Sequence, residues 1–210
     1  MARKPVAAAT YQLRKQPKQA RSKATVDTVL EAAARILVSD GYANASTNII
    51  ADTAGVSIGS LYEYFPGKEA IFAELRRREG MKAYARLVAE PRPTTPPEVM
   101  RHLVTSYIAT YRDNLELLVA LDDEVPRFAI TDMEQSIHED FIPLSDAFLE
   151  AHRSALRPTN DVSFLTEFLM RVIASTILDY AKFSPKHLET PELAETIIDM
   201  AGGWLLKDPC

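Results

Sequence analysis

The chain has 210 residues, of which 47% are hydrophobic and 25% are charged, and its formal net charge is −5. These values are ordinary for a soluble globular protein of one large or two modest domains, and no apolar run approaches the ~18 residues that a membrane-spanning helix needs. Because Cys210 is the single cysteine, an intrachain disulfide is excluded, and because no apolar signal-peptide core precedes Tyr11, we expect a cytoplasmic protein with no membrane partner.

The charges are distributed unevenly along the chain. Residues 1–90 hold 14 Lys and Arg against nine Asp and Glu, whereas the remainder holds 10 against 20. A basic N-terminal part joined to an acidic C-terminal part suggests that only the first part meets phosphate.

Residues 1–21 hold six basic residues, two prolines and no acidic residue. Such a segment buries too little apolar surface to fold alone, so we expect a basic flexible arm. The arm either keeps the chain soluble or contacts DNA, and we favour contact with phosphates over readout of bases.

The first predicted helix spans residues 22–39 and ends at Gly41. Apolar residues recur along it at helical spacing and form one stripe. These residues are Val26, Val29, Leu30, Ala33 and Leu37.

Residues 46–65 predict two short helices joined by a tight turn. Ser46 can cap the first helix, on which Ile50 and Ala54 share a face. Gly55 stands where a chain leaving a helix takes a positive φ, and Ser57 can cap a second helix over residues 58–64. This arrangement is typical of a helix-turn-helix, although small residues and a glycine also join helices in other folds.

Several spaced motifs make the signal more specific. They are Asp40-Gly41-Tyr42, Ser46-Thr47, Ala54-Gly55-Val56-Ser57, Gly59-Ser60-Leu61-Tyr62 and the stretch from Tyr62 to Ala70. Together they resemble the DNA-binding domain of the TetR family of transcriptional regulators over residues 22–72. The resemblance implies an all-α protein with an N-terminal three-helix helix-turn-helix DNA-binding domain at 22–67. It also implies a connecting helix at 68–89 and a C-terminal helical domain at 90–210 that binds an effector and dimerises.

We expect ten residues of the first domain to contact DNA: Ser46, Thr47, Asn48, Ser57, Ile58, Gly59, Ser60, Tyr62, Tyr64 and Lys68. The glycine allows close approach to the DNA backbone, and the resemblance assigns a phosphate role to the threonine and a base-reading role to the asparagine. The tyrosine hydroxyls can reach phosphates, although the rings could instead pack under the next helix. The lysine adds a cation to the free N–H groups at the start of a helix.

Ile58 departs from a common family pattern, because many relatives carry a polar or basic residue there. An isoleucine can touch only a thymine methyl group or the edge of a ring. Hydrogen-bond readout then depends on Asn48, Ser60 and Tyr64.

The helix at 68–89 carries three consecutive arginines at 76–78, which point in different directions and suggest a solvated face. Four prolines within residues 90–97 end it. Beyond them the pattern predicts helices at about 98–112, 114–123, 129–156, 161–183 and 191–206, with no competing strand pattern. Broad apolar stripes on 161–183 and 191–206 fit a core, or the homodimer that the resemblance implies, whose two reading heads would match a palindromic DNA operator.

The resemblance also implies a pocket for a small molecule within residues 90–210. Candidate lining residues are Leu103, Tyr107, Tyr111, Leu118, Phe128, Phe141, Phe148, Phe164 and Phe168. At helical spacing such residues more often form a plain core than a pocket wall. Their apolar character favours a hydrophobic effector of unknown identity, which would release a repressor from its operator.

A metal-binding or enzymatic helical bundle is the alternative, with a structural adaptor as a third class. The residues that would best support the metal-binding or enzymatic bundle are His138-Glu139-Asp140 with His152, or Asp122-Asp123-Glu124. Adjacent residues diverge on a helix, and neither a P-loop nor a nucleophile elbow is present, so exposed polar faces fit these residues better. We therefore expect no enzyme activity, no cofactor and no metal, and an adaptor would leave the helix-turn-helix unexplained.

Overall fold

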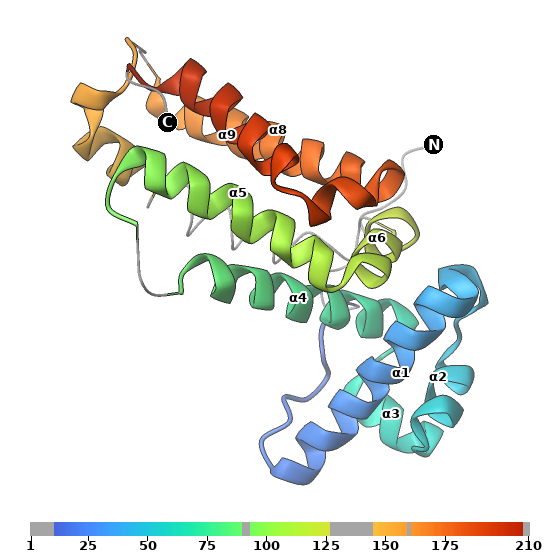
Figure 1. The fold of residues 1–210 in the computed structure, drawn as a ribbon. Helices are drawn as coiled ribbons and strands as arrows, with labels where there is room; N and C mark the ends of the chain where they lie inside the picture. Colours follow the sequence, from blue (N-terminus) through green and yellow to red (C-terminus); the bar gives the residue numbers. More distant parts are fainter. Residues whose placement is uncertain (1–10, 90–92, 127–144, 159–160, 208–210) are drawn as a thin grey trace, which may run out of the picture. The chain divides into compact units, whose positions relative to one another are not determined.

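The computed structural model describes residues 11–89, 93–126, 145–158 and 161–207, and helices dominate these ranges (Figure 1). Within them the only β pairing is an isolated bridge between Leu156 and Leu206. The all-α fold that the sequence predicts is therefore confirmed. The chain divides into two compact units, the first comprising Met1–Gly80 with Glu116–Thr131 and the second Met81–Leu115 with Asp132–Cys210.

The first unit holds the N-terminal helices and a later one. They are α1 (Ala20–Asn44), α2 (Thr47–Ala54), α3 (Ile58–Tyr64), α4 (Lys68–Leu87) as far as Gly80, and α6 (Leu115–Asp123) from Glu116. The apolar stripe of α1 is buried as predicted, with Val26 and Ala33 fully inaccessible to solvent. Leu117, Leu121 and Val125 join the same hydrophobic cluster, so α6 packs with the helix-turn-helix.

A glycine interrupts α1 where the sequence predicts its end. Gly41 has φ 79° and ψ 164°, a conformation that is almost exclusive to glycine. A β-carbon at this position would lie 2.6 Å from Glu124 Oε2. The same carboxylate accepts a 2.7 Å hydrogen bond from the backbone N–H of Tyr42. The backbone angle therefore favours glycine here, and any side chain at this position would also displace the Glu124 carboxylate from its place beside Tyr42.

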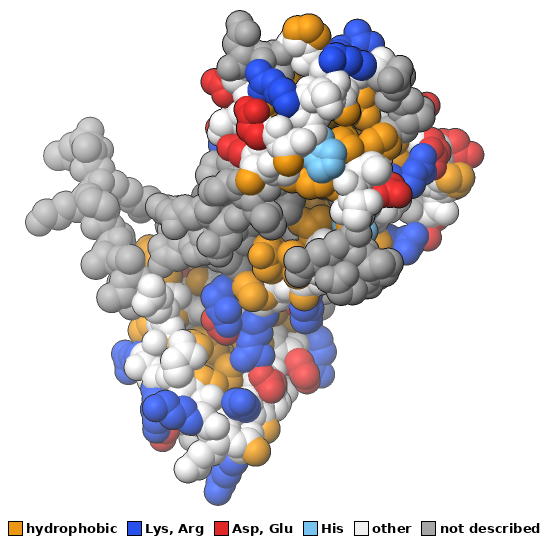
Figure 2. All heavy atoms as spheres, turned by 90° about the vertical axis from the view of Figure 1, so that its left-hand side faces the viewer, with side chains coloured by type: hydrophobic (Ala, Val, Ile, Leu, Met, Phe, Trp, Pro, Cys, Tyr) orange, Lys and Arg blue, Asp and Glu red, His pale blue; other side chains and the backbone are white. Residues whose placement is uncertain are grey.

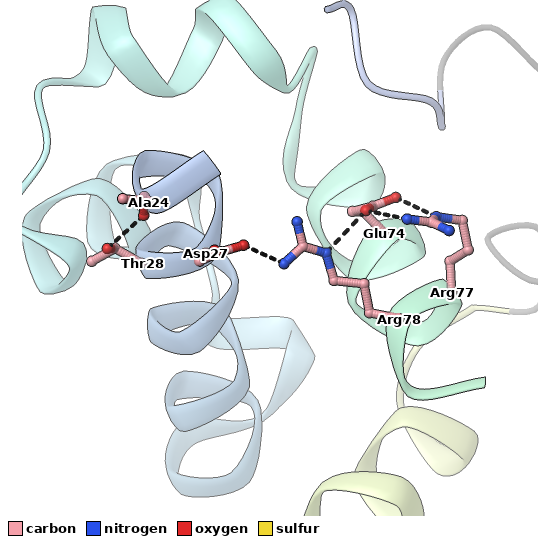
Figure 3. A network of polar contacts seen from close by, with 6 residues as sticks. All are labelled: Ala24, Asp27, Thr28, Glu74, Arg77 and Arg78. Atoms are coloured by element: carbon pink, nitrogen blue, oxygen red, sulfur yellow. Dashed lines mark hydrogen bonds and ion pairs between the residues drawn. The ribbon is translucent and has the colours of Figure 1, made fainter. Parts of the chain in front are cut away.

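Two of the three consecutive arginines of α4 form a network with carboxylates of the first unit (Figure 3). Glu74, only 7% exposed, accepts two 2.7 Å hydrogen bonds from Arg77 and one of 3.1 Å from Arg78. Arg78 also pairs with Asp27 of α1. Arg76 donates a 2.6 Å hydrogen bond to the Leu121 carbonyl of α6. The expectation of a solvated face is thus wrong for Arg76 and Arg78, which tie α4 to α6 and α1, whereas Arg77 is exposed and bonds within α4.

The second unit begins with the end of α4 from Met81. It also holds α5 (Pro96–Asp113), a helical segment at 145–151, η3 (Arg153–Ala155), α8 (Val162–Phe183), η4 (Pro185–Glu189) and α9 (Pro191–Leu205). Helix α5 packs against both α8 and α9. It begins with a capping box in which Glu98 accepts from the backbone N–H groups of Thr94 and Thr95 at 3.0 and 3.1 Å. These N–H groups lower the pKa of Glu98. The helix predicted at 129–156 is described only from residue 145, and there it ends at 151 before a 3-10 turn.

Candidate nucleic-acid interface

Side-chain caps and one glycine build the corner between α2 and α3. Ser46 accepts from the Ile49 N–H at 3.2 Å, and Ser57 accepts from the Ser60 N–H at 3.0 Å. Gly55 ends α2 in the left-handed region at φ 67°. These three local expectations agree with the structure, and they show that both cap hydroxyls already serve the backbone.

The inner side of this corner is closed by apolar packing. Ile50, Ala51 and Leu61 are each at most 1% exposed, and Ala54 and Val56 pack partly buried against the same cluster. The two short helices are therefore held at close range, with the opposite side of α3 open to solvent.

The open side of α3 is formed by Ile58, Gly59, Tyr62 and Glu63, all exposed. Ile58 and Tyr62 stand four residues apart, so they lie on one side of the helix, and each is 39% exposed. The Tyr62 hydroxyl lies 3.0 Å from Thr47 Oγ1, which connects this side of α3 to the start of α2. Next to Thr47, Asn48 is exposed.

Tyr64 does not share this open side. It is 7% exposed and belongs to the hydrophobic cluster together with Leu61, three residues earlier on the same side of α3. Base reading by the Tyr64 ring does not fit this burial, so the expected contribution of Tyr64 needs correction. Ser60 is half-buried, and its hydroxyl lies 2.8 Å from Ser57 Oγ.

Lys68 holds the corner between α1 and α2. Its ammonium group donates 3.0 Å hydrogen bonds to the carbonyls of Tyr42 and Ala45 and lies 4.3 Å from the centre of the Tyr42 ring. The Tyr42 ring also packs edge-on against Phe72 at 5.1 Å. Burial, reinforced by Glu69 and Tyr11, raises the pKa of Tyr42 to about 12. Lys68 thus has a bracing role that its position in the sequence did not suggest.

The N-terminal basic segment is attached to α3 through Arg14. The Arg14 backbone N–H donates to the Tyr64 carbonyl at 2.8 Å, and its guanidinium donates to the Tyr62 carbonyl at 3.1 Å. Leu13 packs partly buried against the core of the first unit. Residues 11–14 are therefore fixed, which differs from the flexible arm that the composition suggests. No signal in the sequence identifies carbonyls 48 and 50 residues away as partners.

One face of the first unit gathers basic side chains. In the view of Figure 2, Lys and Arg side chains (blue) gather on the lower part of the molecule, with Asp and Glu side chains (red) among them. Lys15, Lys18 and Arg21 are exposed and follow directly on the anchored Arg14. Exposed cations in this arrangement can attract a polyanion.

The candidate pocket residues fall into different surroundings. Leu103, Tyr107 and Tyr111 lie half-buried along α5, with the two tyrosine rings 5.8 Å apart. Phe148 is half-buried and lies 4.3 Å from the His152 ring. Leu118 differs from these residues, because it packs against the core of the first unit. Phe128 and Phe141 lie outside the described residues.

Phe164 and Phe168 are surface residues of the second unit. They are 63% and 44% exposed, and their rings stack at 6.0 Å. The Phe168 ring also lies 5.5 Å from that of Trp204 on α9, which is 49% exposed. Both phenylalanines thus lie on the surface of this unit and are not enclosed by it. With Trp204 they form an exposed aromatic row.

The residues named for the metal or enzyme alternative are engaged elsewhere or undescribed. His152 Nδ1 lies 2.9 Å from the Phe148 carbonyl, Asp122 pairs with Arg76, and Glu124 binds the Tyr42 N–H. Residues 138–140 lie outside the described ranges. Across the described ranges no three His, Cys, Asp or Glu side chains group as metal ligands. In those same ranges no helix has the length and hydropathy to cross a membrane.

Comparisons with known proteins agree with this geometry. The family model described as bacterial regulatory proteins, tetR family, matches residues 29–75. The fold is similar to NalD, the secondary repressor of the MexAB-OprM multidrug efflux pump in Pseudomonas aeruginosa, with 20% identity, a TM-score of 0.72 and coverage of 90% of this chain and 100% of that one. It is also similar to SmeT, the repressor of the Stenotrophomonas maltophilia multidrug efflux pump SmeDEF, with 20% identity, a TM-score of 0.66 and coverage of 89% and 93%. The fatty acid degradation regulator FadR from Bacillus halodurans shares 17% identity at a TM-score of 0.68, with coverage of 87% and 94%. No curated protein sequence matches the chain.

Proposed function

From its membership of the TetR family of transcriptional regulators, we propose that the chain is a repressor that binds a palindromic DNA operator as a homodimer and leaves it when a small hydrophobic molecule binds. The observation that carries the proposal is the open side of α3, presented by a helix-turn-helix whose inner side is completely packed. A short helix held in this way can enter the major groove, while the start of α2 follows the DNA backbone.

The contacts divide by chemistry. Asn48 has a free amide on an exposed position and is the proposed base reader from α2. Thr47 and Tyr62 share a hydroxyl pair that can turn to a phosphate oxygen. Gly59 presents no side chain and lets the sugar-phosphate backbone come close. The caps Ser46 and Ser57 hold the backbone N–H groups near that contact.

The basic segment adds phosphate contacts next to α3. Arg14 is tied to the carbonyl end of α3, so Lys15, Lys18 and Arg21 start from a fixed point on the reading head. A fixed cation loses less conformational entropy on binding than one on a free tail. We assign these residues to the phosphates that flank the groove.

The homodimer forms through α8 and α9. Phe164, Phe168 and Trp204 leave a continuous aromatic row in contact with water, and Met200 on α9 is 52% exposed. Large exposed apolar patches mark interaction sites. A second copy is the occupant that suits a palindromic operator, because two-fold symmetry brings two identical heads to two half-sites.

A hydrophobic effector is supported by the half-buried row of Leu103, Tyr107 and Tyr111 on α5, which offers apolar surface with two hydroxyls. SmeT has been solved as a complex with triclosan. The effector must bind the DNA-free conformation more tightly than the operator complex, since a ligand shifts an equilibrium only through such a difference. A coupling of about 1–3 kcal/mol lowers operator occupancy between severalfold and a hundredfold.

Selection of genomic DNA fragments by the full-length protein tests the reading head. We expect an enriched palindrome, and recovery of no enriched sequence would refute the proposed repressor. On that operator the affinity should fall steeply with salt, because each phosphate contact releases counterions.

Charge variants test the basic segment on the same operator. Lys15→Gln, Lys18→Gln and Arg21→Gln should each weaken binding to all sequences alike and lower the slope of log affinity against log salt by about 1. Lys186→Gln removes the same charge from an exposed position in the second unit and should leave the slope unchanged. Equal slopes in all four variants would remove the segment from the interface.

A further inference from the structure

We propose that Ile58 recognises a thymine through the 5-methyl group that this base presents in the major groove. The inference rests on the proposed function and specifies which base the first turn of α3 reads. Each half-site of the operator then contains one thymine whose methyl group is buried against Ile58.

The position of Ile58 makes its side chain accessible to a base. It is the first residue of α3, directly after the cap Ser57, and 39% of it is exposed on the open side of the helix. Its neighbour Gly59 has no side chain, and a β-carbon there would meet only Ser57 Oγ, at 3.8 Å. Nothing on this turn therefore shields the isoleucine from a base edge.

The polar groups beside Ile58 already have partners. Ser60 Oγ and Ser57 Oγ lie 2.8 Å apart, and Ser57 Oγ also caps the helix. The Tyr62 hydroxyl lies 3.0 Å from Thr47 Oγ1. The side of α3 formed by Ile58 and Tyr62 thus meets the groove mainly with apolar surface.

The chemistry of the groove selects the base. In the major groove each base pair presents donors and acceptors, and the thymine methyl is the one apolar group among them. An isoleucine against a guanine or an adenine edge would cover acceptors without satisfying them, which is costly. Contact with the methyl group instead removes apolar surface from water on both partners.

The size of the effect follows from the loss of one methyl group. Replacing thymine by deoxyuridine removes only this group and keeps every hydrogen bond of the base pair. We expect about a fourfold loss of affinity at the contacted position in one half-site, which corresponds to about 0.8 kcal/mol per buried carbon. Substitution in both half-sites should multiply to about sixteenfold, since the positions are well separated.

The test scans the selected operator with single deoxyuridines and measures binding of the full-length protein by fluorescence anisotropy. Wild type should show one sensitive thymine per half-site. In Ile58→Ala that sensitivity should fall below twofold, because the partner of the methyl group is gone. Val38→Ala shortens another exposed aliphatic side chain of the first unit, 42% exposed on α1, and should keep it.

A second experiment restores the methyl group at the sensitive base pair. A C·G pair in place of the sensitive T·A pair should weaken binding, and 5-methylcytosine should recover about fourfold of the loss. A scan in which no deoxyuridine matters to wild type would overturn the inference while the repressor proposal stands. So would an Ile58→Ala protein that keeps the full sensitivity. Failure to select any operator would instead refute the proposed function.

Discussion

Replacement of Lys68 by Met distinguishes a bracing lysine from a phosphate-binding one. The ammonium group donates two 3.0 Å hydrogen bonds, to the carbonyls of Tyr42 and Ala45, and both pairs are partly buried. A hydrogen bond to a charged group contributes about 1.5–3 kcal/mol, and ordering a lysine side chain costs up to about 2 kcal/mol. The net loss on substitution should therefore be about 1–4 kcal/mol in the free energy of unfolding.

The assay is urea unfolding of the DNA-free protein, followed by far-UV circular dichroism. Lys23→Met is the matched control, because Lys23 is exposed on α1, and it should change stability by no more than about 0.5 kcal/mol. A lysine that only meets phosphate contributes nothing in the absence of DNA. If Lys68→Met unfolds at the wild-type urea concentration, the brace is refuted, and any loss of operator affinity then belongs to a phosphate contact.

Three further results are expected. Gly41→Ala should lower the free energy of unfolding by about 2–4 kcal/mol, because of backbone strain at φ 79° and displacement of Glu124. In a Glu124→Ala background the same substitution should cost less. A Gly41→Ala protein as stable as wild type would contradict this. Burial raises the pKa of Tyr42 to about 12, so its contribution to stability is complete below pH 10 and is lost as the pH rises to 12. Solvent screening reduces it to about 1 kcal/mol, and Tyr42→Phe should lack this loss when unfolding is measured across that range. Phe168→Glu with Trp204→Glu should sediment as a monomer with unchanged helicity, and a persistent dimer would place the interface elsewhere.

The parts of the fold that depend on near neighbours in sequence were predictable. Ser46 and Ser57 each cap an N–H three residues away, and Gly55 turns the chain on its own. Burial of Ile50 and Leu61 follows from spacing within two short helices. Such interactions need no knowledge of the rest of the molecule, which is why the helix-turn-helix could be identified from the sequence.

The predictions failed where the sequence does not determine which side of a helix is buried. Tyr62 and Tyr64 stand two apart and so point differently, and only the pairing of Tyr64 with Leu61 at a spacing of three indicates which one is buried. On α8 the buried stripe includes Leu165 and Leu169, and Phe168 stands one position off it. Apolar composition alone does not separate these two sides.

Lys68 and Arg14 illustrate a different limit. Their partners are backbone carbonyls between 23 and 50 residues away, and every residue type offers a carbonyl. No side-chain pattern can therefore mark the acceptor. A basic residue near a DNA-binding motif is naturally assigned to phosphate, whereas both of these side chains first satisfy carbonyls of the protein itself.

Helix α6, from the acidic part of the chain, stabilises the helix-turn-helix. Its residues Leu117 and Leu121 are buried in the core of the first unit, and Glu124 follows one residue after its end. From there the Glu124 carboxylate holds the Tyr42 N–H at 2.7 Å, while Lys68 holds the Tyr42 carbonyl at 3.0 Å. The corner that leads into α2 is thus clamped on both sides of one residue. Because the sequence passes from this corner to the start of α2 within a few residues, a displacement of α6 would release the N–H side of the clamp directly beside the proposed DNA contacts.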